Sequence, residues 1–417
     1  MAHDAAKRIN DSIYGNINVS EQELRLIDTP TFQRLHQIRQ LGAANLVYPG
    51  ATHTRFAHCI GTMHMMSQFL HALKRSREKH ERETDMEKLR IAALLHDIGH
   101  YPYSHTLEKA VKRLGGMSHE EFGRYLLKKF LSDKLDTYRA DEISDLFSGG
   151  KGYASPLISS ALDADKSDYL IRDSYHCGVP YGRVSIQRLV RTMSYVKSGI
   201  VFEKDEISAE DFLIGRYHMY RAVYHHKTVT SFNLMVERIY ENMVMEGYMT
   251  SPKDLANEDD EYSITNYTDD MLFASMHKYL ESGTGRFTKS LIKLFLAREP
   301  LECVYINPQP AQKGIVPEEA EKIKRLETSE SERSRLADMA GMKPEDIFVV
   351  SLRPLSLIDE QTNVYIRNKG KLKPITESSG LVLNMIGSKT LHDARIYAIP
   401  GSGRKLAKAL GSYLKKG

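Results

Sequence analysis

The sequence predicts a mainly α-helical protein with a smaller α+β domain at its C-terminal end. Apolar residues recur at helical spacing from Glu21 to about Arg298. After about Pro300, turn residues and β-branched runs replace that pattern. The chain has 417 residues, 41% of them hydrophobic, which is enough to build two or three domains with a stable core. We therefore expect a helical domain over residues 1–300 and an α+β domain over residues 301–417.

Six segments of the first region carry apolar residues on one helical side and predict helices. They are Phe56–Lys74, Met86–Ile98, Thr106–Leu114, Glu120–Leu131, Leu157–Asp173 and Phe232–Glu246. Between the last two, short β-prone runs flank Ser198-Gly199 and predict a small hairpin near residues 194–202. The acidic run Asn257–Glu261 is typical of a solvated loop.

The C-terminal region alternates turn signals with β-branched runs. Residues 307–310, Asn-Pro-Gln-Pro, predict a linker. The polar segment Pro317–Gly341 predicts one helix, because it starts with proline and acidic residues and ends at glycine. Strands are predicted over Ile347–Leu352, Val364–Ile366 and Ile396–Ile399, followed by a basic amphipathic helix over Arg404–Lys415.

Composition argues against several classes of protein. No run approaches the ~20 apolar residues of a membrane helix, and Met1–Asn10 is too polar for a secretory signal. The three widely spaced cysteines predict a reducing, cytoplasmic location rather than a disulfide framework. The 58 basic residues nearly balance the 54 acidic ones, which does not indicate nucleic acid as a partner. The basic C-terminal helix could contact nucleic acid or a second subunit, although a solvated helix face explains it as well.

Histidines are concentrated in one part of the sequence, where nine of the 17 lie between His53 and His119. His96-Asp97 ends an apolar helix, where an unpaired carboxylate is costly to bury and a divalent metal ion would compensate it. The same dipeptide at residues 3–4 and 392–393 has no comparable surroundings. Around His96-Asp97, by contrast, other polar and charged residues gather: Arg55, His58, His100, His105, His119 and Glu120. The concentration of these residues around His96-Asp97 favours a functional site.

Metal binding needs further ligands from other helices. His58 lies on the preceding predicted helix, and Asp165 lies in a stretch rich in charged residues. Two histidines and two carboxylates would hold one transition metal ion with positions left for water, as a hydrolytic site requires. Iron, manganese and zinc all accept this set of ligands. Taken on its own, the stretch around Asp165 is more typical of an ordinary surface helix with internal ion pairs.

The order His58, His96-Asp97, Asp165 resembles the signature of the HD-domain metal-dependent phosphohydrolases. Within that family, several stretches resemble the deoxynucleoside triphosphate triphosphohydrolases. They are Lys7–Asp11, Ile27–Leu35, Gln40–Gly42, Arg55–His58, His96–His100, Ser104-His105, His119-Glu120, Asp163–Asp173 and Tyr224–Lys227. The resemblance covers most of residues 7–230 and implies a helical HD core.

The resemblance implies a reaction and roles for the clustered residues. His58, His96, Asp97 and Asp165 would hold the metal ion, with Mg²⁺ accompanying the triphosphate. Activated water would attack the α-phosphorus of a deoxynucleoside triphosphate and release a deoxynucleoside and inorganic triphosphate. In this scheme His105 is the general acid, His100 and His119 lie at the phosphate, and Glu120 and Glu108 orient the imidazole rings.

The resemblance also implies contacts with the substrate. Arg55, Lys166 and Arg216 would neutralise the phosphates, and Tyr169 and Asp173 would lie near the sugar and phosphates. Gln40 would bind the 3′-hydroxyl, with Leu41 against the sugar edge that a 2′-hydroxyl would occupy. Tyr224 matches the family pattern, whereas Tyr220 replaces a substrate-contacting histidine and predicts different base or sugar contacts.

A nucleotide effector and an oligomer are further implications of the resemblance. Lys7, Asn10, Asp28 and Gln33 match an effector site of the family, in which His36 replaces an arginine. Helix capping explains Asp28 and Gln33 equally well. Relatives assemble, so a homo-oligomer, a dimer or tetramer, is expected. The alternatives are an HD phosphohydrolase for ribonucleoside triphosphates, monophosphates or cyclic nucleotides, and a regulator that binds nucleotides or nucleic acid without turnover.

Overall fold

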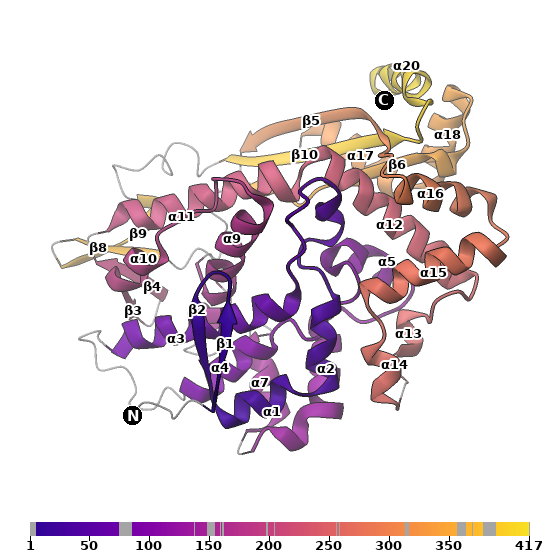
Figure 1. The fold of residues 1–417 in the computed structure, drawn as a ribbon. Helices are drawn as coiled ribbons and strands as arrows, with labels where there is room; N and C mark the ends of the chain where they lie inside the picture. Colours follow the sequence, from indigo (N-terminus) through magenta and orange to yellow (C-terminus); the bar gives the residue numbers. More distant parts are fainter. Residues whose placement is uncertain are drawn as a thin grey trace.

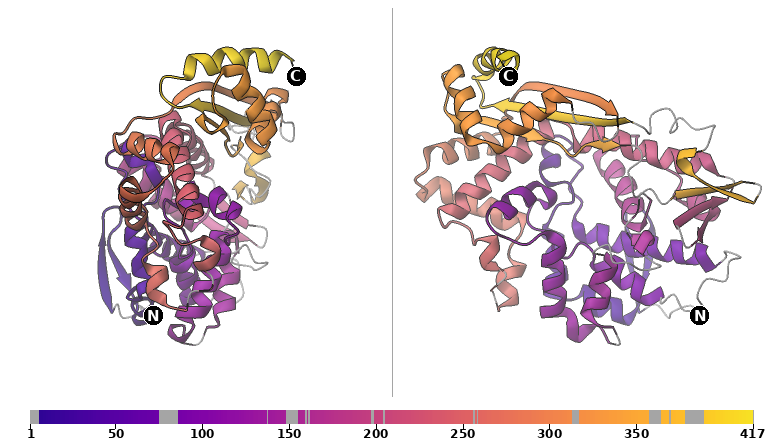
Figure 2. Two further views of the ribbon diagram at one scale, coloured as in Figure 1. Left: turned by 90° about the vertical axis from the view of Figure 1, so that its right-hand side faces the viewer. Right: turned by 180° about the vertical axis from the view of Figure 1, so that it is seen from behind.

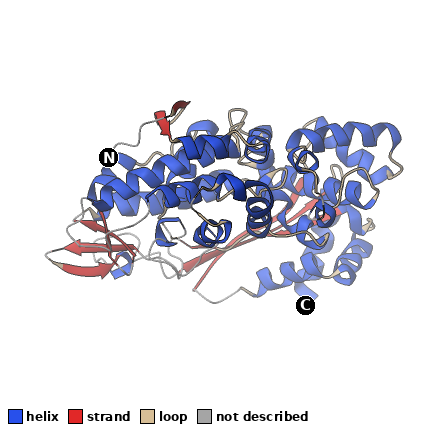
Figure 3. Cartoon of the chain, turned by 90° about the horizontal axis from the view of Figure 1, so that it is seen from below, coloured by secondary structure: helices blue, strands red, loops and turns tan. Residues whose placement is uncertain are grey.

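Helices form most of the chain, and strands are confined to a few places (Figures 1 and 3). The computed structural model describes residues 6–74, 86–136, 138–147, 155–158, 160, 162–196, 199–203, 205–255, 257, 259–312, 317–356, 364–368, 370–377 and 389–416. The mainly α fold predicted from the sequence is therefore confirmed. Within these residues no helix combines the length and the apolar character needed to cross a bilayer.

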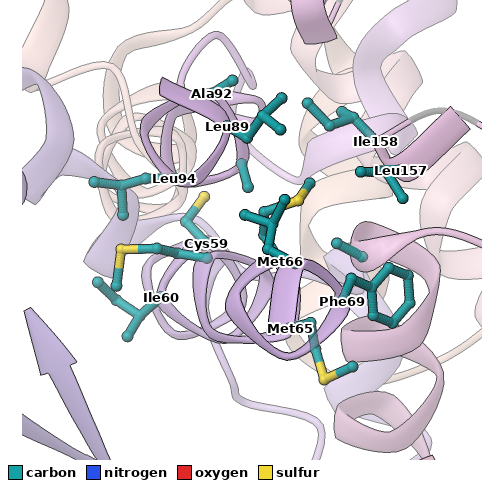
Figure 4. Close-up of a cluster of buried hydrophobic side chains, with 14 of the residues drawn as sticks. Cys59, Ile60, Met65, Met66, Phe69, Leu89, Ala92, Leu94, Leu157 and Ile158 are labelled. Carbon is teal, nitrogen blue, oxygen red and sulfur yellow. The ribbon is translucent and has the colours of Figure 1, made fainter. Parts of the chain in front are cut away.

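Three helices form the centre of the first region. They are α3 (Arg55–Lys74), α4 (Met86–Leu95) and α9 (Ala164–Cys177), and α3 packs against both of the others. Its side chains Cys59, Met66 and Phe69 are buried against α4 and its neighbours (Figure 4). A helix covered on nearly all sides is apolar on nearly all sides, which is why α3 lacks a clear polar face.

Other helices surround this centre or form a second core beside it. They are α1 (Glu21–Ile27), α2 (Pro30–Gln33), α5 (Glu108–Arg113), α6 (His119–Leu126), α7 (Ala140–Phe147), α8 (Ser155–Ile158), α10 (Ile186–Thr192), α11 (Glu206–Met219), α12 (Lys227–Met245), α13 (Pro252–Leu255), α14 (Glu261–Thr265), α15 (Asp269–Ser282) and α16 (Arg286–Leu296). The second core gathers around α12, where Phe232, Met235 and Ile239 are buried.

Two predicted elements differ in extent from those of the structure. The helix expected from Leu157 begins only at Ala164, because the Asp163 side chain accepts a hydrogen bond from the Lys166 amide and caps it. The acidic segment expected as a loop ends in α14, where Glu261 accepts hydrogen bonds from the amide and hydroxyl of Thr31. A local capping residue therefore starts α9, whereas the Glu261 contact at the start of α14 joins segments 230 residues apart.

The C-terminal region contains a sheet between two helical layers (Figure 2). Strands β5 (Glu302–Gln312), β10 (Lys389–Ala398) and β6 (Ile347–Ser351) are adjacent in that order, and β7 (Leu355–Ser356) also pairs with β10. Alternate residues face opposite layers, as strand geometry requires. Phe348 and Tyr397 pack toward α12, whereas Ile347 and Ile396 pack toward α17 (Glu318–Thr328), α18 (Glu330–Ala340) and α20 (Gly403–Lys416).

Two expectations for this region are wrong. The segment 307–310 is no linker but the middle of β5, in register with β10. β5 is an edge strand, where proline is tolerated because a missing N–H faces away from the sheet. The single helix expected over Pro317–Gly341 is two helices, since Ser329 is extended and its hydroxyl caps α18 at Glu332. The basic helix at the C-terminal end is confirmed as α20.

Two small sheets complete the fold. β1 (Lys7–Asp11) pairs with β2 (Gly15–Val19) in an N-terminal hairpin. The predicted hairpin is confirmed as β3 (Met193–Val196) and β4 (Gly199–Glu203), while Ser198 lies outside the described residues. β4 also pairs in parallel with β8 (Val364–Asn368), which pairs with β9 (Lys371–Pro374). Segments from both predicted domains thus share one sheet, and the division at residue 300 stays a prediction.

Gly61 allows the close approach of α3 and α9, so Gly61→Ala should destabilise the fold by about 3 kcal/mol. A β-carbon at this position would lie 2.0 Å from Asp168 Oδ1 and 2.3 Å from Arg172 Nη2. Urea unfolding measures the loss. Gly411→Ala on α20 is the control, because a β-carbon there meets nothing within 4 Å and improves helix propensity. Equal stability of Gly61→Ala and wild type would contradict the packing.

Candidate metal centre and catalytic cavity

The four predicted metal ligands converge from three elements. His58 comes from α3, His96 and Asp97 from the turn after α4, and Asp165 from the first turn of α9. Asp165 Oδ1 lies 3.0 Å from His58 Nε2 and 3.6 Å from His96 Nε2. Asp97 lies 3.5 Å from His58 Nε2 through Oδ2 and 3.4 Å from His96 Nε2 through Oδ1. These distances surround a point that one cation could occupy.

Hydrogen bonds fix which ring nitrogen of each histidine faces that point. His58 Nδ1 donates to Asp168 Oδ2 at 2.8 Å, and His96 Nδ1 donates to the Ala93 carbonyl at 2.8 Å. Each Nε2 is therefore the ring nitrogen available to a cation, and both Nε2 atoms are buried without a hydrogen bond to any described residue. Two imidazoles and two carboxylates suit iron, manganese or zinc. The residues present therefore fit a transition metal ion, and His58, His96 and Asp97 form a candidate metal group.

The histidines and carboxylates around this point shift each other's pKa values in opposite directions. Burial lowers the pKa of His58, but Asp165, Asp168 and Asp97 raise it to about 10. Burial raises the pKa of Asp165, but His58 and His96 hold it well below its usual range. The carboxylates thus create a negative potential that a proton or a metal cation can balance.

A buried ion pair supports His58 from behind. Asp168 receives two hydrogen bonds from Arg172, at 2.8 and 2.9 Å, and Arg172 also donates to Asp11 at 2.8 Å. Burial raises the pKa of Asp168, but Arg172 and His58 lower it to about 2. Asp168 thus stays ionised and holds the His58 ring, as carboxylates behind metal-binding histidines commonly do. Because Asp163, Asp168 and Arg172 are buried, α9 is no ordinary solvated helix.

The remaining histidines form a second cluster beside the first. Glu108 Oε1 lies 2.8 Å from His105 Nδ1 and 2.7 Å from His119 Nδ1, so one carboxylate orients both rings. The His100 ring stacks on His119 with a centroid distance of 4.3 Å. Glu120 is farther away, 4.0 Å from His119 Nε2. The orienting role expected of Glu108 and Glu120 is therefore supported best for Glu108.

The stacked His100 and His119 rings differ in the direction of their pKa shifts. Burial and the Arg55 guanidinium lower the pKa of His100 well below its usual value, so this ring is neutral. Burial also lowers the pKa of His119, but its hydrogen bond to Glu108 raises it above the usual value. The cluster therefore places a neutral ring near Asp97, and beside Glu108 a second ring that holds a proton more readily than an ordinary histidine.

Most of the predicted site residues line one cavity of about 390 Å³. They are Gln40, Arg55, His96, Asp97, His105, His119, Glu120, Asp165, Lys166, Tyr169, Arg216 and Tyr220. Sequence reasoning missed three other lining residues, Ile158, Ser160 and Arg353. His58, His100, Leu41, Asp173 and Tyr224 do not line it. Arg353 lies 133 positions beyond Tyr220, and no motif in the sequence indicated that it would reach this cavity.

Three of the cationic side chains of the cavity lie against fixed partners. Arg55 donates to Ser104 Oγ at 2.8 Å and to Asp97, and it is only 2% exposed. Lys166 donates to Asp163 Oδ2 at 2.9 Å. The Arg216 guanidinium lies 5.7 Å from the centre of the Tyr220 ring. These contacts position the charges before any ligand binds, which favours recognition of phosphate.

Asp173 and Tyr224 lie behind the cavity instead of facing it. Asp173 Oδ1 lies 2.7 Å from His53 Nε2, and Asp173 Oδ2 accepts a 2.7 Å hydrogen bond from Tyr224. Both carboxylate oxygens are therefore occupied. The Tyr224 ring in turn packs edge-on to Tyr169 and Tyr220. In this geometry the two residues position the tyrosines of the wall.

The predicted effector residues are exposed and spread over different elements. Lys7 and Asn10 lie on β1, Asp28 ends α1, and Gln33 ends α2, where its side chain donates to the Ile27 carbonyl at 2.8 Å. His36 stacks on the Phe56 ring with a centroid distance of 3.6 Å. No hydrogen bond or ion pair joins these five residues within the described chain. The effector role stays a prediction.

Comparison with known proteins supports the family suggested by these residues. Residues 55–173 match the HD domain, and residues 184–415 match the HD associated region. The first match begins three residues before His58 and ends at Asp173, so it contains all four candidate metal ligands.

The chain belongs to the HD-domain phosphohydrolase superfamily.

The sequence similarity between this HD-domain protein and its relatives extends over different lengths of the chain. It is 35% identical over 400 residues to an uncharacterized protein of Methanocaldococcus jannaschii, covering 94% of this chain and 79% of that protein. It is 31% identical over 280 residues to the deoxynucleoside triphosphate triphosphohydrolase SAMHD1 homolog of Dictyostelium discoideum, covering 61% of this chain and 54% of that protein. The chain thus spans about half the length of that triphosphohydrolase.

Two solved structures resemble the whole HD-domain chain. One is a hypothetical protein from Aquifex aeolicus, with a TM-score of 0.75 at 26% identity, covering 97% of this chain and 99% of that one. The other is a phosphohydrolase from Bacteroides thetaiotaomicron, with a TM-score of 0.73 at 25% identity, covering 94% and 99%. The likeness includes the C-terminal region as well as the HD domain.

A strained turn links the HD motif to the second core. Tyr103 and Ser104 both have positive φ, 55° and 54°, which is costly for residues other than glycine. The buried Asp269 at the start of α15 accepts hydrogen bonds from the amides of Tyr103 (2.6 Å) and Arg39 (3.1 Å). Ser104 in turn donates to the Arg39 carbonyl and accepts from Arg55. Asp269 therefore fixes the turn that holds Arg55, and no sequence motif indicated it.

Replacing the predicted ligand His96 should lower the metal content of the protein, whereas the same change in the second His-Asp dipeptide should not. His96→Ala is expected to lower the metal content at least about tenfold, because a buried nitrogen donor is lost. Inductively coupled plasma mass spectrometry of purified protein measures it. His392→Ala, in the other dipeptide within the described chain, is the control and should keep wild-type metal. Full metal content in His96→Ala would exclude this ring as a ligand.

Removing the Asp269 charge should impair activity without loss of metal. In Asp269→Asn an amide NH₂ replaces one of the two carboxylate oxygens that accept hydrogen bonds from the Tyr103 and Arg39 amides. The turn before His105 should therefore shift, and kcat should fall about 10- to 100-fold. Metal content should equal that of wild type. Unchanged kcat in this variant would show that the turn is held without Asp269.

The same carboxylate should give stability a distinct pH dependence. Burial raises the pKa of Asp269 to about 6, above its value of about 4 in an unfolded chain. Its contribution to stability is therefore fully present below pH ~4 and is lost as the pH rises through about 6. Relative to Asp269→Asn, wild type should gain about 1 kcal/mol of unfolding free energy between pH 7.5 and pH 5. Urea unfolding at both pH values measures this, and a gain in the opposite direction would contradict the burial.

Proposed function

We propose that this chain hydrolyses deoxynucleoside triphosphates to a deoxynucleoside and inorganic triphosphate. The observation that carries the proposal is one cavity lined by three of the four metal ligands, by the two histidines that Glu108 bridges and by four arginine and lysine side chains. The similarity to a deoxynucleoside triphosphate triphosphohydrolase from Dictyostelium discoideum supports this substrate class.

The chain's own residues would bind and orient the triphosphate. Lys166, Arg216 and Arg55 place three positive charges on the cavity wall, where phosphate oxygens could accept their hydrogen bonds. A divalent transition metal ion held by the HD residues would act as a Lewis acid that activates water and neutralises phosphate charge. Because Arg55 also donates to Asp97, its position couples phosphate binding to the metal ligands.

The histidine cluster would supply the proton that the reaction needs. As the water oxygen bonds to the α-phosphorus, the bond from phosphorus to the 5′-oxygen breaks, and that oxygen takes a proton. His105 lies at the cavity wall with Nδ1 2.8 Å from Glu108, which leaves Nε2 to carry the proton. The proton released by the attacking water goes to solvent or to a neighbouring base.

Gln40 and Leu41 would contact the sugar of the substrate. Its side-chain oxygen is buried in the cavity wall without a hydrogen-bond partner among the described residues. Such an acceptor favours a ligand that brings a hydroxyl donor, as the 3′-hydroxyl would. Both ribose and deoxyribose carry a 3′-hydroxyl, so a preference for deoxyribose would depend on Leu41, which follows Gln40 and is half-buried against the core beside the cavity lining.

Product analysis distinguishes this activity from its alternatives. The purified protein is incubated with each deoxy- and ribonucleoside triphosphate plus Mn²⁺, Mg²⁺ or Fe²⁺, and the products are separated by anion exchange. Inorganic triphosphate and a deoxynucleoside are expected. Release of pyrophosphate or single phosphate would assign the site to another nucleotide reaction, and binding without turnover would make the chain a regulator.

Loss of the general acid should affect turnover and spare the metal. His105→Ala is expected to lower kcat about 100-fold or more, because the leaving oxygen loses its proton donor. The metal content should stay at the wild-type level. His277→Ala, an exposed histidine on α15, serves as the control and should leave kcat unchanged. An unchanged rate in His105→Ala would place the acid elsewhere.

A further inference from the structure

Arg353 is a basic residue of the C-terminal region that reaches the catalytic cavity. It follows β6, while every other lining residue among the described ones lies at or before Tyr220. Its side chain is exposed, which places it at the open side of the cavity. The C-terminal region therefore contributes a charge to a site otherwise built by the first 220 residues.

The backbone on both sides of Arg353 is anchored. The Leu352 amide donates to the Asp393 carbonyl on β10 at 2.9 Å, and Leu355 pairs with Leu391 on the same strand. Pro354 further restricts the preceding residue to extended conformations. Arg353 thus sits on a short, fixed connection between two strands that pair with β10.

The same connection is tied to the histidine cluster. Glu327 on α17 accepts a 2.8 Å hydrogen bond from the Ser351 amide and a 2.5 Å hydrogen bond from Lys109. Lys109 follows Glu108, the carboxylate that bridges His105 and His119. Glu327 therefore holds the end of β6 against α5, next to the predicted acid.

The Arg353 guanidinium differs from the other cations of the cavity. It makes no hydrogen bond or ion pair with any described residue, whereas Arg55 and Lys166 both donate to aspartates. An arginine presents a planar fork of donors that matches two phosphate oxygens at once. An anchored backbone with a free guanidinium is suited to bind a ligand anion.

We propose that Arg353 binds the terminal phosphate of the substrate and thereby selects a triphosphate. The inference rests on the proposed function, in which the α-phosphate lies at the metal ligands. The polyphosphate chain then extends from Asp97 and Asp165 toward the open side, where Arg353 lies. Arg353 is thus a specificity-determining residue supplied by the C-terminal region.

Binding measurements test this inference without turnover. Isothermal titration with inorganic triphosphate, and separately with a deoxynucleoside, is carried out on metal-loaded wild type, Arg353→Ala and Arg353→Lys. Arg353→Ala should weaken triphosphate binding about 10- to 100-fold and leave deoxynucleoside binding within about twofold. Arg353→Lys should be intermediate, because it keeps the charge and loses the fork. Arg404→Ala, an exposed arginine on α20 outside this cavity, is the matched control and should bind as wild type.

The outcomes separate this inference from the proposed function. Equal triphosphate affinity of Arg353→Ala and wild type would overturn the inference, and so would a selective loss of deoxynucleoside affinity, which would place Arg353 at the base. If wild type hydrolyses no deoxynucleoside triphosphate but binds inorganic triphosphate through Arg353, the proposed function fails while the contact stands.

Discussion

The candidate metal centre depends on the buried contact between α3 and α9. Arg172 and Asp168 form an ion pair inside the protein, and Asp168 holds the His58 ring through Nδ1. A buried charge pair of this kind is costly unless every member is satisfied, and here Asp11 and His58 complete the network. The pair is possible only because Gly61 leaves room for it on α3. Removing one member would leave an uncompensated charge beside the metal ligands.

The catalytic cavity connects parts of the chain that are far apart in sequence. Asp269 on α15 fixes the turn that positions Arg55, and Glu327 on α17 fixes the strand end that carries Arg353. Both are carboxylates that accept backbone N–H groups near the cavity. The second core and the C-terminal sheet therefore do more than cover the HD helices, because each one holds a side of the site.

Sequence patterns predicted a helix well where apolar residues recur at helical spacing, and they misplaced its start where a local capping residue decides it. The central helix α3 was expected from its apolar residues, whereas α9 starts seven residues later than expected because Asp163 caps it. The prolines of residues 307–310 suggested a linker, since proline usually breaks a strand. Only the position of β5 at the sheet edge explains why they are tolerated.

The sequence by itself determined the chemistry of the site. The order of His58, His96-Asp97 and Asp165, with the histidines that follow, was enough to indicate a metal-dependent phosphohydrolase of the HD family. Tertiary structure alone decided that Asp168 orients His58 and that Asp269 holds the strained turn, and it favoured Glu108 over Glu120 as the partner of His105 and His119. It alone brought Arg353 to the cavity. The physical reason is that ligand types and local spacing are properties of the chain, whereas the partner of a buried charge is chosen by packing between distant segments.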